Sequence, residues 1–279
     1  MNVVTKPRLR LMNLFHRNFL VMTVGIFGLA LPVFARAAEN PATIKASELA
    51  NQLSALRQNG SSYVRLRLEV KGASSQTLQL QIKERRTKNA TEVVYQVLWP
   101  KERKGESVLL RMVGNRPASG SVFVPPNLVN AIDDLKAPLL GSDLAYADVI
   151  EDFFAWDQQM FLGTEEIDRV SCQIIESKPG KSDRSIYGSV RSWVDMKRLI
   201  PLRVEKYSSS GQLVRRIDST RVVSDDGGYI PANLMVSGVR SNSSSLFEGS
   251  RIKHDVSYTD RDFTPDGIKE VASPRGAGE

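Results

Sequence analysis

The sequence has little of what most active sites and metal sites require. It contains one cysteine, Cys172, and two histidines, His16 and His254. A single thiol excludes an intramolecular disulfide, so the folded state must depend on its hydrophobic core. The common zinc patterns need paired thiols or spaced histidines and carboxylates, and none is present. We therefore expect no cofactor, no metal site and no catalytic residues, and we interpret the protein as a non-enzyme.

The two residues that remain as candidates for chemistry both lie in alternating segments. His254 falls in step with Ile252 and Val256, and Cys172 falls in step with Val170. Strict alternation predicts the apolar face of a strand. We expect both side chains to be buried members of the core rather than a general base and a nucleophile.

Long hydrophobic runs are also missing. The apolar run at residues 19–33 is shorter than the roughly 20 residues that a membrane-spanning helix needs. It follows a basic, acid-free start and precedes Ala35-Arg36-Ala37. This arrangement is typical of a secretory signal peptide, predicted here at residues 1–37 with cleavage after Ala37. The residue directly after that site is Ala38 and not a cysteine that could take a lipid anchor. The expected product is therefore a soluble periplasmic protein.

Most of the basic excess belongs to this first segment. The whole chain has a net charge of +7, but residues 1–37 hold five Lys and Arg and no acid. The remainder carries 33 basic and 31 acidic residues. A nearly balanced chain has no electrostatic reason to bind nucleic acid, and we exclude that partner. The pairs Arg85-Arg86 and Arg215-Arg216 are interpreted as solvated surface.

After one predicted helix, the spacing of apolar residues in the mature chain changes from a helical pattern to the alternation of strands. Apolar positions predict a helix at residues 44–58, and short alternating segments separated by turn residues follow it. Predicted strands cover residues 63–70, 78–82, 92–99, 107–113, 121–124, 168–177, 185–196, 202–207, 213–224, 229–237 and 247–258. Strands of this length without intervening helices favour an antiparallel sheet that is curled or covered, because open edges aggregate.

One interlude breaks this series. Leu128, Ile132 and Leu135 predict a second helix at residues 127–135, with Asn127 as its cap. The aromatic stretch at residues 153–162 has two interpretations. It is ordinary core beneath the sheet, or it is a lid that forms part of a cavity wall.

The middle of this interlude carries a motif. Residues 141–148 read Gly-Ser-Asp-Leu-Ala-Tyr-Ala-Asp, and a proline pair precedes them at Pro125-Pro126. The run Tyr-Gly-Ser-Val-Arg-Ser-Trp-Val-Asp follows at residues 187–195. In this order the motifs resemble the outer-membrane lipoprotein-sorting proteins, the LolA/LolB-like family, over residues 63–268. The signature residues are Gly141, Ser142, Asp143, Tyr146 and Asp148.

The resemblance implies a mainly β fold with some α structure. A strongly curved antiparallel sheet, an unclosed barrel, would be covered by helices around an apolar cavity that receives acyl chains. We expect a single LolA-like domain at residues 38–273 and a disordered tail at residues 274–279. The candidate cavity residues are Leu66, Leu68, Val70, Leu78, Leu80, Ile82, Leu128, Ile132, Phe153, Trp156 and Phe161.

Two functions fit this expectation. The first is a soluble periplasmic carrier or chaperone that binds lipid or lipoprotein acyl chains for transfer towards the outer membrane. Such a carrier would exchange its cargo with a membrane-bound donor or acceptor protein. The alternative is a regulatory or sensor module of related fold that binds a membrane-bound partner or accompanies a lipid exporter.

Overall fold

A computed structural model describes residues 45–57, 60–73, 75–114, 116–239 and 242–273. The chain from Ile44 onward forms one compact unit. The predicted signal peptide, its cleavage site and the tail at residues 274–279 lie outside the described residues, and the domain limits 38 and 273 stay predictions. None of the helices within the described ranges has the length and apolar character that crossing a membrane demands.

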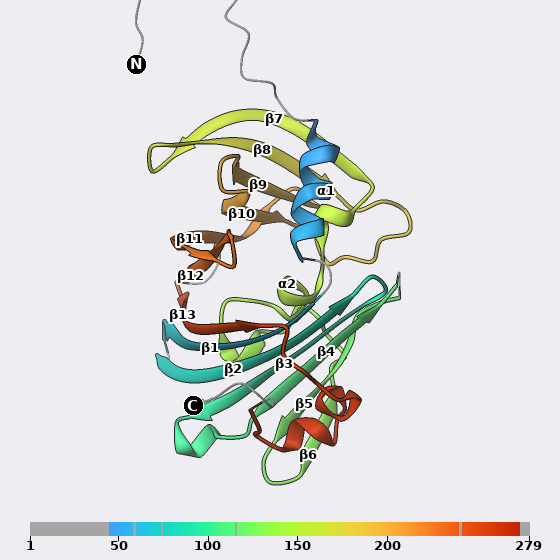
Figure 1. Ribbon diagram of the computed structural model, residues 1–279, viewed down its shortest axis with the longest axis vertical. Helices are drawn as coiled ribbons and strands as arrows, with labels where there is room; N and C mark the ends of the chain where they lie inside the picture. The colour runs from blue at the N-terminus through green and yellow to red at the C-terminus, as the bar shows by residue number, and fades with distance from the viewer. Residues whose placement is uncertain (1–44, 58–59, 74, 115, 240–241, 274–279) are drawn as a thin grey trace, which may run out of the picture. The chain divides into compact units, whose positions relative to one another are not determined.

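The described residues form a 13-stranded antiparallel sheet that does not close into a barrel (Figure 1). The strand order is β6-β5-β4-β3-β2-β1-β13-β12-β11-β10-β9-β8-β7, so β6 and β7 are its edges. The strands are β1 Gly60–Lys71, β2 Gln76–Thr87, β3 Ala90–Trp99, β4 Ser107–Val113, β5 Ser119–Val124, β6 Leu128–Ala131, β7 Gln158–Ile167, β8 Val170–Lys178, β9 Ser189–Asp195, β10 Ile200–Tyr207, β11 Leu213–Asp225, β12 Gly228–Gly238 and β13 Ser244–His254. The predicted mainly β fold with an unclosed, curved sheet is confirmed.

Two meanders meet in the middle of this sheet. Strands β1 to β6 pair in sequence order on one side, and β7 to β13 pair in sequence order on the other. The joint between them is the antiparallel pair β1–β13, where Tyr63 lies opposite Lys253 and Leu68 lies opposite Phe247. Neighbouring strands elsewhere are joined by local connections, and this joint alone pairs the first described strand with the last.

Tight turns connect several neighbours. The β7–β8 turn consists of Asp168 and Arg169, which have φ angles of 49° and 66°. The β11–β12 turn consists of Asp226 and Gly227, with φ angles of 44° and 75°. Positive φ at both central residues is the requirement of a two-residue hairpin turn that matches the twist of the strands.

Within the described residues the helices are few and short. Helix α1, Ala46–Arg57, confirms the predicted first helix and buries Leu49 and Leu53. In Figure 1 it lies across the strands at the β7 end of the sheet, where it contacts β7 and the 3-10 turn η3, Phe153–Ala155. The other short turns are α2 Tyr146–Ile150, η1 Lys101–Arg103, η2 Leu139–Gly141, η4 Asp260–Phe263 and η5 Gly267–Lys269.

The two faces of β2 to β4 are covered by different parts of the chain. On the inner face, Leu78 and Leu80 of β2, with Leu68 of the neighbouring β1, join a cluster with residues that follow β6. On the outer face, Phe263 and Ile268 of the last described segment pack in a separate cluster. Strand alternation makes this double covering possible, since successive side chains point to opposite faces.

The predicted helix at residues 127–135 is wrong. Residues 128–131 form strand β6, which pairs with β5 so that Val129 lies opposite Phe123. The spacing of Leu128 and Ile132 is four residues, and this spacing puts side chains on one face in a strand as well as in a helix. Pairing with β5, which the local pattern does not reveal, decides between the two.

The burial prediction for His254 is also wrong, whereas that for Cys172 is confirmed. Cys172 is fully buried. His254 is exposed at the end of β13, with its Nε2 2.5 Å from Oδ2 of Asp225. Strand β13 ends at His254 and Asp255 has a φ of +53°, so Val256 no longer continues the alternation that the sequence predicts.

Candidate functional site

The inner face of the sheet is covered by residues 133–157, which we name the covering segment. It includes η2, α2 and η3. Among the described residues, the backbone–backbone hydrogen bonds of the covering segment connect it only to itself. Tyr146 N–H donates to the Ala137 carbonyl, and Ala147 N–H donates to the Leu135 carbonyl. The chain enters it from Ile132, whose N–H still donates to Gly120 of β5. The covering segment is therefore held on the sheet by side chains.

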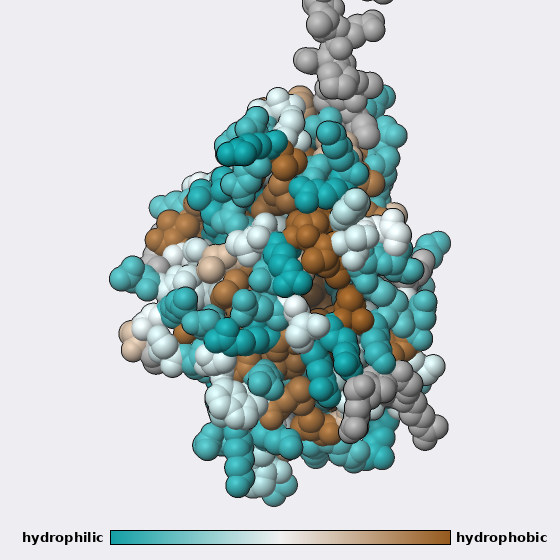
Figure 2. All heavy atoms as spheres, turned by 60° about the vertical axis from the view of Figure 1, so that its left-hand side comes forward, coloured by the Kyte–Doolittle hydropathy of each residue, from teal (hydrophilic) through white to brown (hydrophobic). Residues whose placement is uncertain are grey.

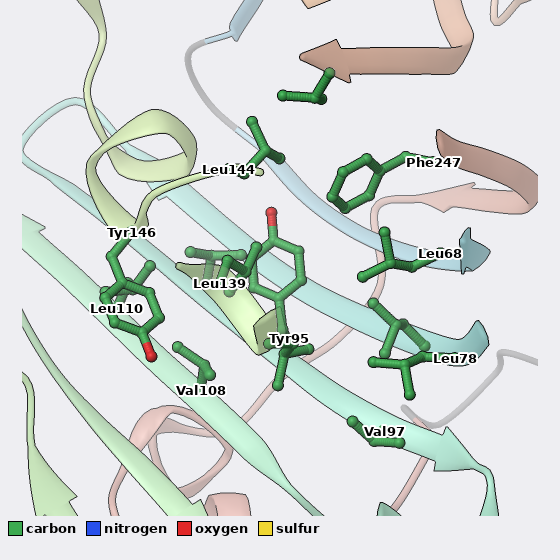
Figure 3. Packing of buried hydrophobic residues seen from close by; sticks show 14 of the residues in the cluster. Leu68, Leu78, Tyr95, Val97, Val108, Leu110, Leu139, Leu144, Tyr146 and Phe247 are labelled. Atoms are coloured by element: carbon green, nitrogen blue, oxygen red, sulfur yellow. The ribbon is translucent and has the colours of Figure 1, made fainter. Parts of the chain in front are cut away.

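Apolar side chains make the larger part of this attachment. Leu139 and Leu144 of the covering segment lie beside Tyr95 of the sheet, and Tyr146 lies beside Leu110 and Val108 (Figure 3). The buried members of this inner cluster that the covering segment supplies are Leu139, Leu140, Leu144, Tyr146 and Ile150. They occupy the place where the sequence predicts an acyl-chain cavity, so the space beneath the covering segment is filled by the protein itself.

The signature residues begin with a polar anchor at the β13 end of this interface. The Asp143 carboxylate accepts hydrogen bonds from the hydroxyls of Ser243 and Ser245 at 2.5 and 2.7 Å. The Asp143 N–H donates to the Ser245 hydroxyl. Gly141 has a φ of +83°, and a Cβ there would lie 2.7 Å from the side-chain nitrogen of Gln76. These contacts fix the first part of the segment against β2 and β13.

A second anchor is a buried cluster of charges around Asp148. Its carboxylate, fully buried, accepts hydrogen bonds from the Tyr187 hydroxyl at 2.6 Å and from Lys206 Nζ at 2.7 Å. Arg215 donates to the other carboxylate oxygen, as does the N–H of Ala145. Burial by itself raises the pKa of Asp148, but the charges of Lys206 and Arg215 outweigh it and hold the pKa below its usual value.

The predicted cavity residues fall into four groups, and most of them lie in two neighbouring clusters that also contain parts of the covering segment. Leu68, Val70, Leu78 and Leu80 are buried in the inner cluster; Leu66, Ile82 and Ile132 pack against it; Phe153 and Trp156 are buried in the cluster around α1. Leu128 on β6 and Phe161 on β7 belong to neither cluster, with 54% and 38% of their surface exposed. The assignment of the others to a ligand site stays a prediction.

Sequence reasoning missed the cations of this site. The prediction that Arg215-Arg216 is solvated surface is wrong, because Arg215 binds Asp148 and Arg216 binds Glu205. Arg85 is likewise paired, with Glu92 and Asp260. A signal was present in the alternation: Val204 and Lys206 share one strand face, which places a lysine beside an apolar position that is buried in the cluster around α1.

One surface hollow borders the inner cluster, and another lies at the last described segment. A cleft of about 750 Å³ is lined by Val70, Leu78, Trp99 and Arg103, among others, and the first two belong to the inner cluster. A second hollow, of about 560 Å³, is lined by polar residues of the last segment such as Arg261. Figure 2 shows apolar residues gathered in an interrupted band, recessed near its middle, on one face of the protein.

Comparison with known proteins finds solved structures that share this fold. A DUF1329 family protein from Desulfovibrio piger matches with a TM-score of 0.73 and 21% identity, over 78% of this chain and 95% of that one. A candidate outer membrane lipoprotein-sorting protein domain from Vibrio parahaemolyticus has a TM-score of 0.72 and 18% identity, over 81% and 98%. A LolA superfamily protein from Nitrosomonas europaea has a TM-score of 0.63 and 19% identity, over 80% and 98%.

No curated protein matches the sequence significantly. A family model described as an uncharacterized protein matches residues 89–270, which include the whole covering segment and the strands that carry Lys206 and Arg215. The chain therefore belongs to this family of uncharacterized proteins, and its fold is that of the LolA-like outer-membrane lipoprotein-sorting proteins.

Proposed function

We propose that this protein is a periplasmic carrier that binds the acyl chains of a lipid or lipoprotein between the inner face of its sheet and the covering segment. The observation that carries the proposal is that, among the described residues, no backbone–backbone hydrogen bond joins the covering segment to the sheet, so that every contact between them involves a side chain. A segment without ladder bonds to the sheet can lift as a unit, because no strand pairing has to be broken. The shared fold with lipoprotein-sorting proteins supports the same function.

The energies of the closed and loaded forms are comparable. Burying an aliphatic side chain stabilises by about 1.5–3 kcal/mol, so Leu139, Leu140, Leu144 and Ile150 together contribute roughly 10 kcal/mol to closure. An acyl chain with about twelve buried methylenes gains roughly the same amount. The free-energy change for replacing the covering segment by an acyl chain is then close to zero. Such a carrier would load and release its cargo with a small net change in free energy, which a membrane-bound donor or acceptor could shift in either direction.

The test is direct binding of a fluorescent acyl probe to the purified protein. We expect wild-type protein to bind the probe, and we expect Leu80→Glu and Ile132→Glu to weaken binding because a carboxylate cannot be solvated on the apolar face. Leu56→Glu is the matched control, since Leu56 of α1 is 67% exposed. Circular dichroism of each variant checks that the sheet persists. Folded wild-type protein that neither binds the probe nor carries lipid on purification contradicts the carrier function.

One observation favours the second function, a module that binds a membrane-bound partner. Strand β7 is an edge of the sheet, and three of its successive residues, Met160, Phe161 and Leu162, are 49%, 38% and 40% exposed. Edge strands can accept an extended segment of another protein as an additional strand. If the acyl probe does not bind, capture of an inner-membrane protein by photo-cross-linking from β7 is the result that this alternative expects.

A further inference from the structure

Lys206 and Arg215 form a cation pair on the inner face of the sheet. They lie opposite each other in the β10–β11 register. The Lys206 side chain is 1% exposed and the Arg215 side chain 17% exposed. Lys206 Nζ also lies 5.3 Å from the ring centre of Phe153 and 4.9 Å from that of Tyr187. A buried ammonium group beside a guanidinium group requires a nearby anion.

The anion that meets this requirement belongs to the covering segment. Asp148 of α2 bonds both cations, and Glu151 follows one turn later on the same segment. The Glu151 carboxylate accepts a hydrogen bond from the Ser185 hydroxyl at 2.7 Å. Both carboxylates would leave with the covering segment when it lifts. The sheet would then retain two cations on this face without their carboxylate partner.

The cation pair lies at one end of an apolar surface. Val204 lies two residues before Lys206, and Ile217 lies two residues after Arg215, so each shares a strand face with its cation. Val204 is buried in the cluster around α1. Ile217 packs against both that cluster and the inner cluster. The surface that the covering segment protects thus runs from apolar strands to two positive charges.

The covering segment has the complementary composition. Its buried side chains are apolar, such as Leu144 and Ile150, and Asp148 supplies one buried carboxylate among them. At the cation pair it therefore presents one bonded carboxylate next to apolar side chains, as an anionic amphiphile would. A ligand that replaces the covering segment must cover the apolar strands and must also supply an anionic group to Lys206 and Arg215.

We propose, on the basis of the carrier function above, that Lys206 and Arg215 form a head-group site for an anionic amphiphile. The ligand would be an acyl chain that ends in a carboxylate or a phosphate. In the closed form Asp148 occupies the position of that anionic group. Arginine and lysine bind oxyanions through charge-assisted hydrogen bonds, and here they do so beside a surface for the chain.

The first test uses wild-type protein and pairs of ligands that differ in head-group charge. A neutral fluorescent acyl ester is displaced by palmitate or by methyl palmitate, and in a second pair by lysophosphatidate or by monoacylglycerol. We expect each anionic ligand to displace the probe at a concentration about tenfold lower than its neutral counterpart. Acetate and inorganic phosphate, which lack a chain, should not displace it.

The results separate this proposal from the carrier function. Equal potency of the charged and neutral ligands overturns the head-group site but leaves the carrier function intact. Failure of the protein to bind any acyl ligand overturns both. Displacement by inorganic phosphate alone overturns the amphiphile and indicates a plain anion site.

Variants locate the preference on the proposed residues. Lys206→Met should abolish most of the roughly tenfold preference for palmitate over methyl palmitate. Asp148→Asn removes the competing carboxylate and should raise the affinity for palmitate more than that for the ester. Arg203→Met is the control: Arg203 pairs with Asp218 on the same two strands at 2.7 Å. Arg203 lies three positions before Lys206 on the same strand, so its side chain faces the other side of the sheet.

The control should keep the wild-type preference. Equal losses of acid and ester binding in folded Lys206→Met protein, or loss of the preference in Arg203→Met, contradict the proposal. The ligand pairs with wild-type protein and with Asp148→Asn give an answer even if Lys206→Met does not fold.

Discussion

Glu151 is a buried carboxyl group whose surroundings favour its neutral form. Only 5% of the residue is exposed, and its Oε1 atom has no hydrogen-bond partner in the described structure. Burial raises the pKa of Glu151, and the nearby charge of Asp148 raises it further. The hydrogen bond from Ser185 and the charge of Lys206 act in the opposite direction without cancelling the effect. A proton on Glu151 therefore stabilises the folded state.

This pKa shift predicts how Glu151→Gln changes stability with pH. A group whose pKa is higher in the folded state contributes stability that is fully present below its unfolded pKa, 4.5, and that is lost as pH rises through the folded pKa. The neutral amide avoids that loss. We expect Glu151→Gln to melt a few degrees above wild type at pH 7.5, where about 1 kcal/mol corresponds to roughly 2–4 °C. The two proteins should melt together near pH 4.

Thermal melts followed by circular dichroism across this pH range provide the measurement. The contribution of Asp148 changes with pH in both proteins and cancels in their difference. Glu166→Gln, at an exposed position of β7, is the control and should follow wild type throughout. A Glu151→Gln protein that melts below wild type at pH 7.5 would show that the ionised carboxylate is needed.

At this scale the sequence identifies the anions of the site better than its cations. Asp143 and Asp148 stand out because they belong to a recognisable motif. Lys206 and Arg215 do not, since a lysine or arginine within a strand is normally solvated. Their burial depends on a carboxylate that is 58 residues or more away along the chain, and only the folded structure brings the groups together.

Among the elements, strands were predicted most accurately. Alternation and turn chemistry suffice for hairpins such as β11–β12, because both act over a few residues. Strand β7 was missed because it is an edge strand, exposed along most of its length, and lacks clear alternation. The covering segment was predicted as a cover, but its helix at residues 127–135 was misplaced, since pairing with β5 overrides a helical pattern.

The packing of the last described segment on the outer face of the sheet predicts how a substitution there changes the free energy of unfolding. Phe263 of η4 is fully buried in a cluster with Val94 and Leu109. Its ring lies 5.3 Å from that of Tyr258 and 4.7 Å from the guanidinium of Arg85. We expect Phe263→Ala to lower the free energy of unfolding by about 3–5 kcal/mol, the cost of a large cavity in a core.

Urea denaturation measures this change. Leu56→Ala, at a position that is 67% exposed, should change the free energy of unfolding by less than about 0.5 kcal/mol. If Phe263→Ala costs no more than this control, the outer cover is not part of the cooperative fold.

The whole molecule carries a prediction about its location. The basic start, the short apolar run and Ala35-Arg36-Ala37 predict export and cleavage. We expect the mature protein to begin at Ala38 and to be released from cells by osmotic shock, which N-terminal mass spectrometry can establish. Recovery of the uncleaved chain from membranes would instead indicate a retained anchor.

The joint between β1 and β13 has a consequence for the order of folding. These two strands are separated by most of the described chain, yet they are neighbours in the centre of the sheet. During the predicted export, each meander could pair locally as it leaves a translocation channel, but the two could not unite until residues 244–254 had emerged. Long-range pairing of this kind is slow, because the chain entropy is lost before the contacts form. We therefore expect the described sheet to stay incomplete, and the chain to stay extended enough to pass through a channel, until β13 has crossed.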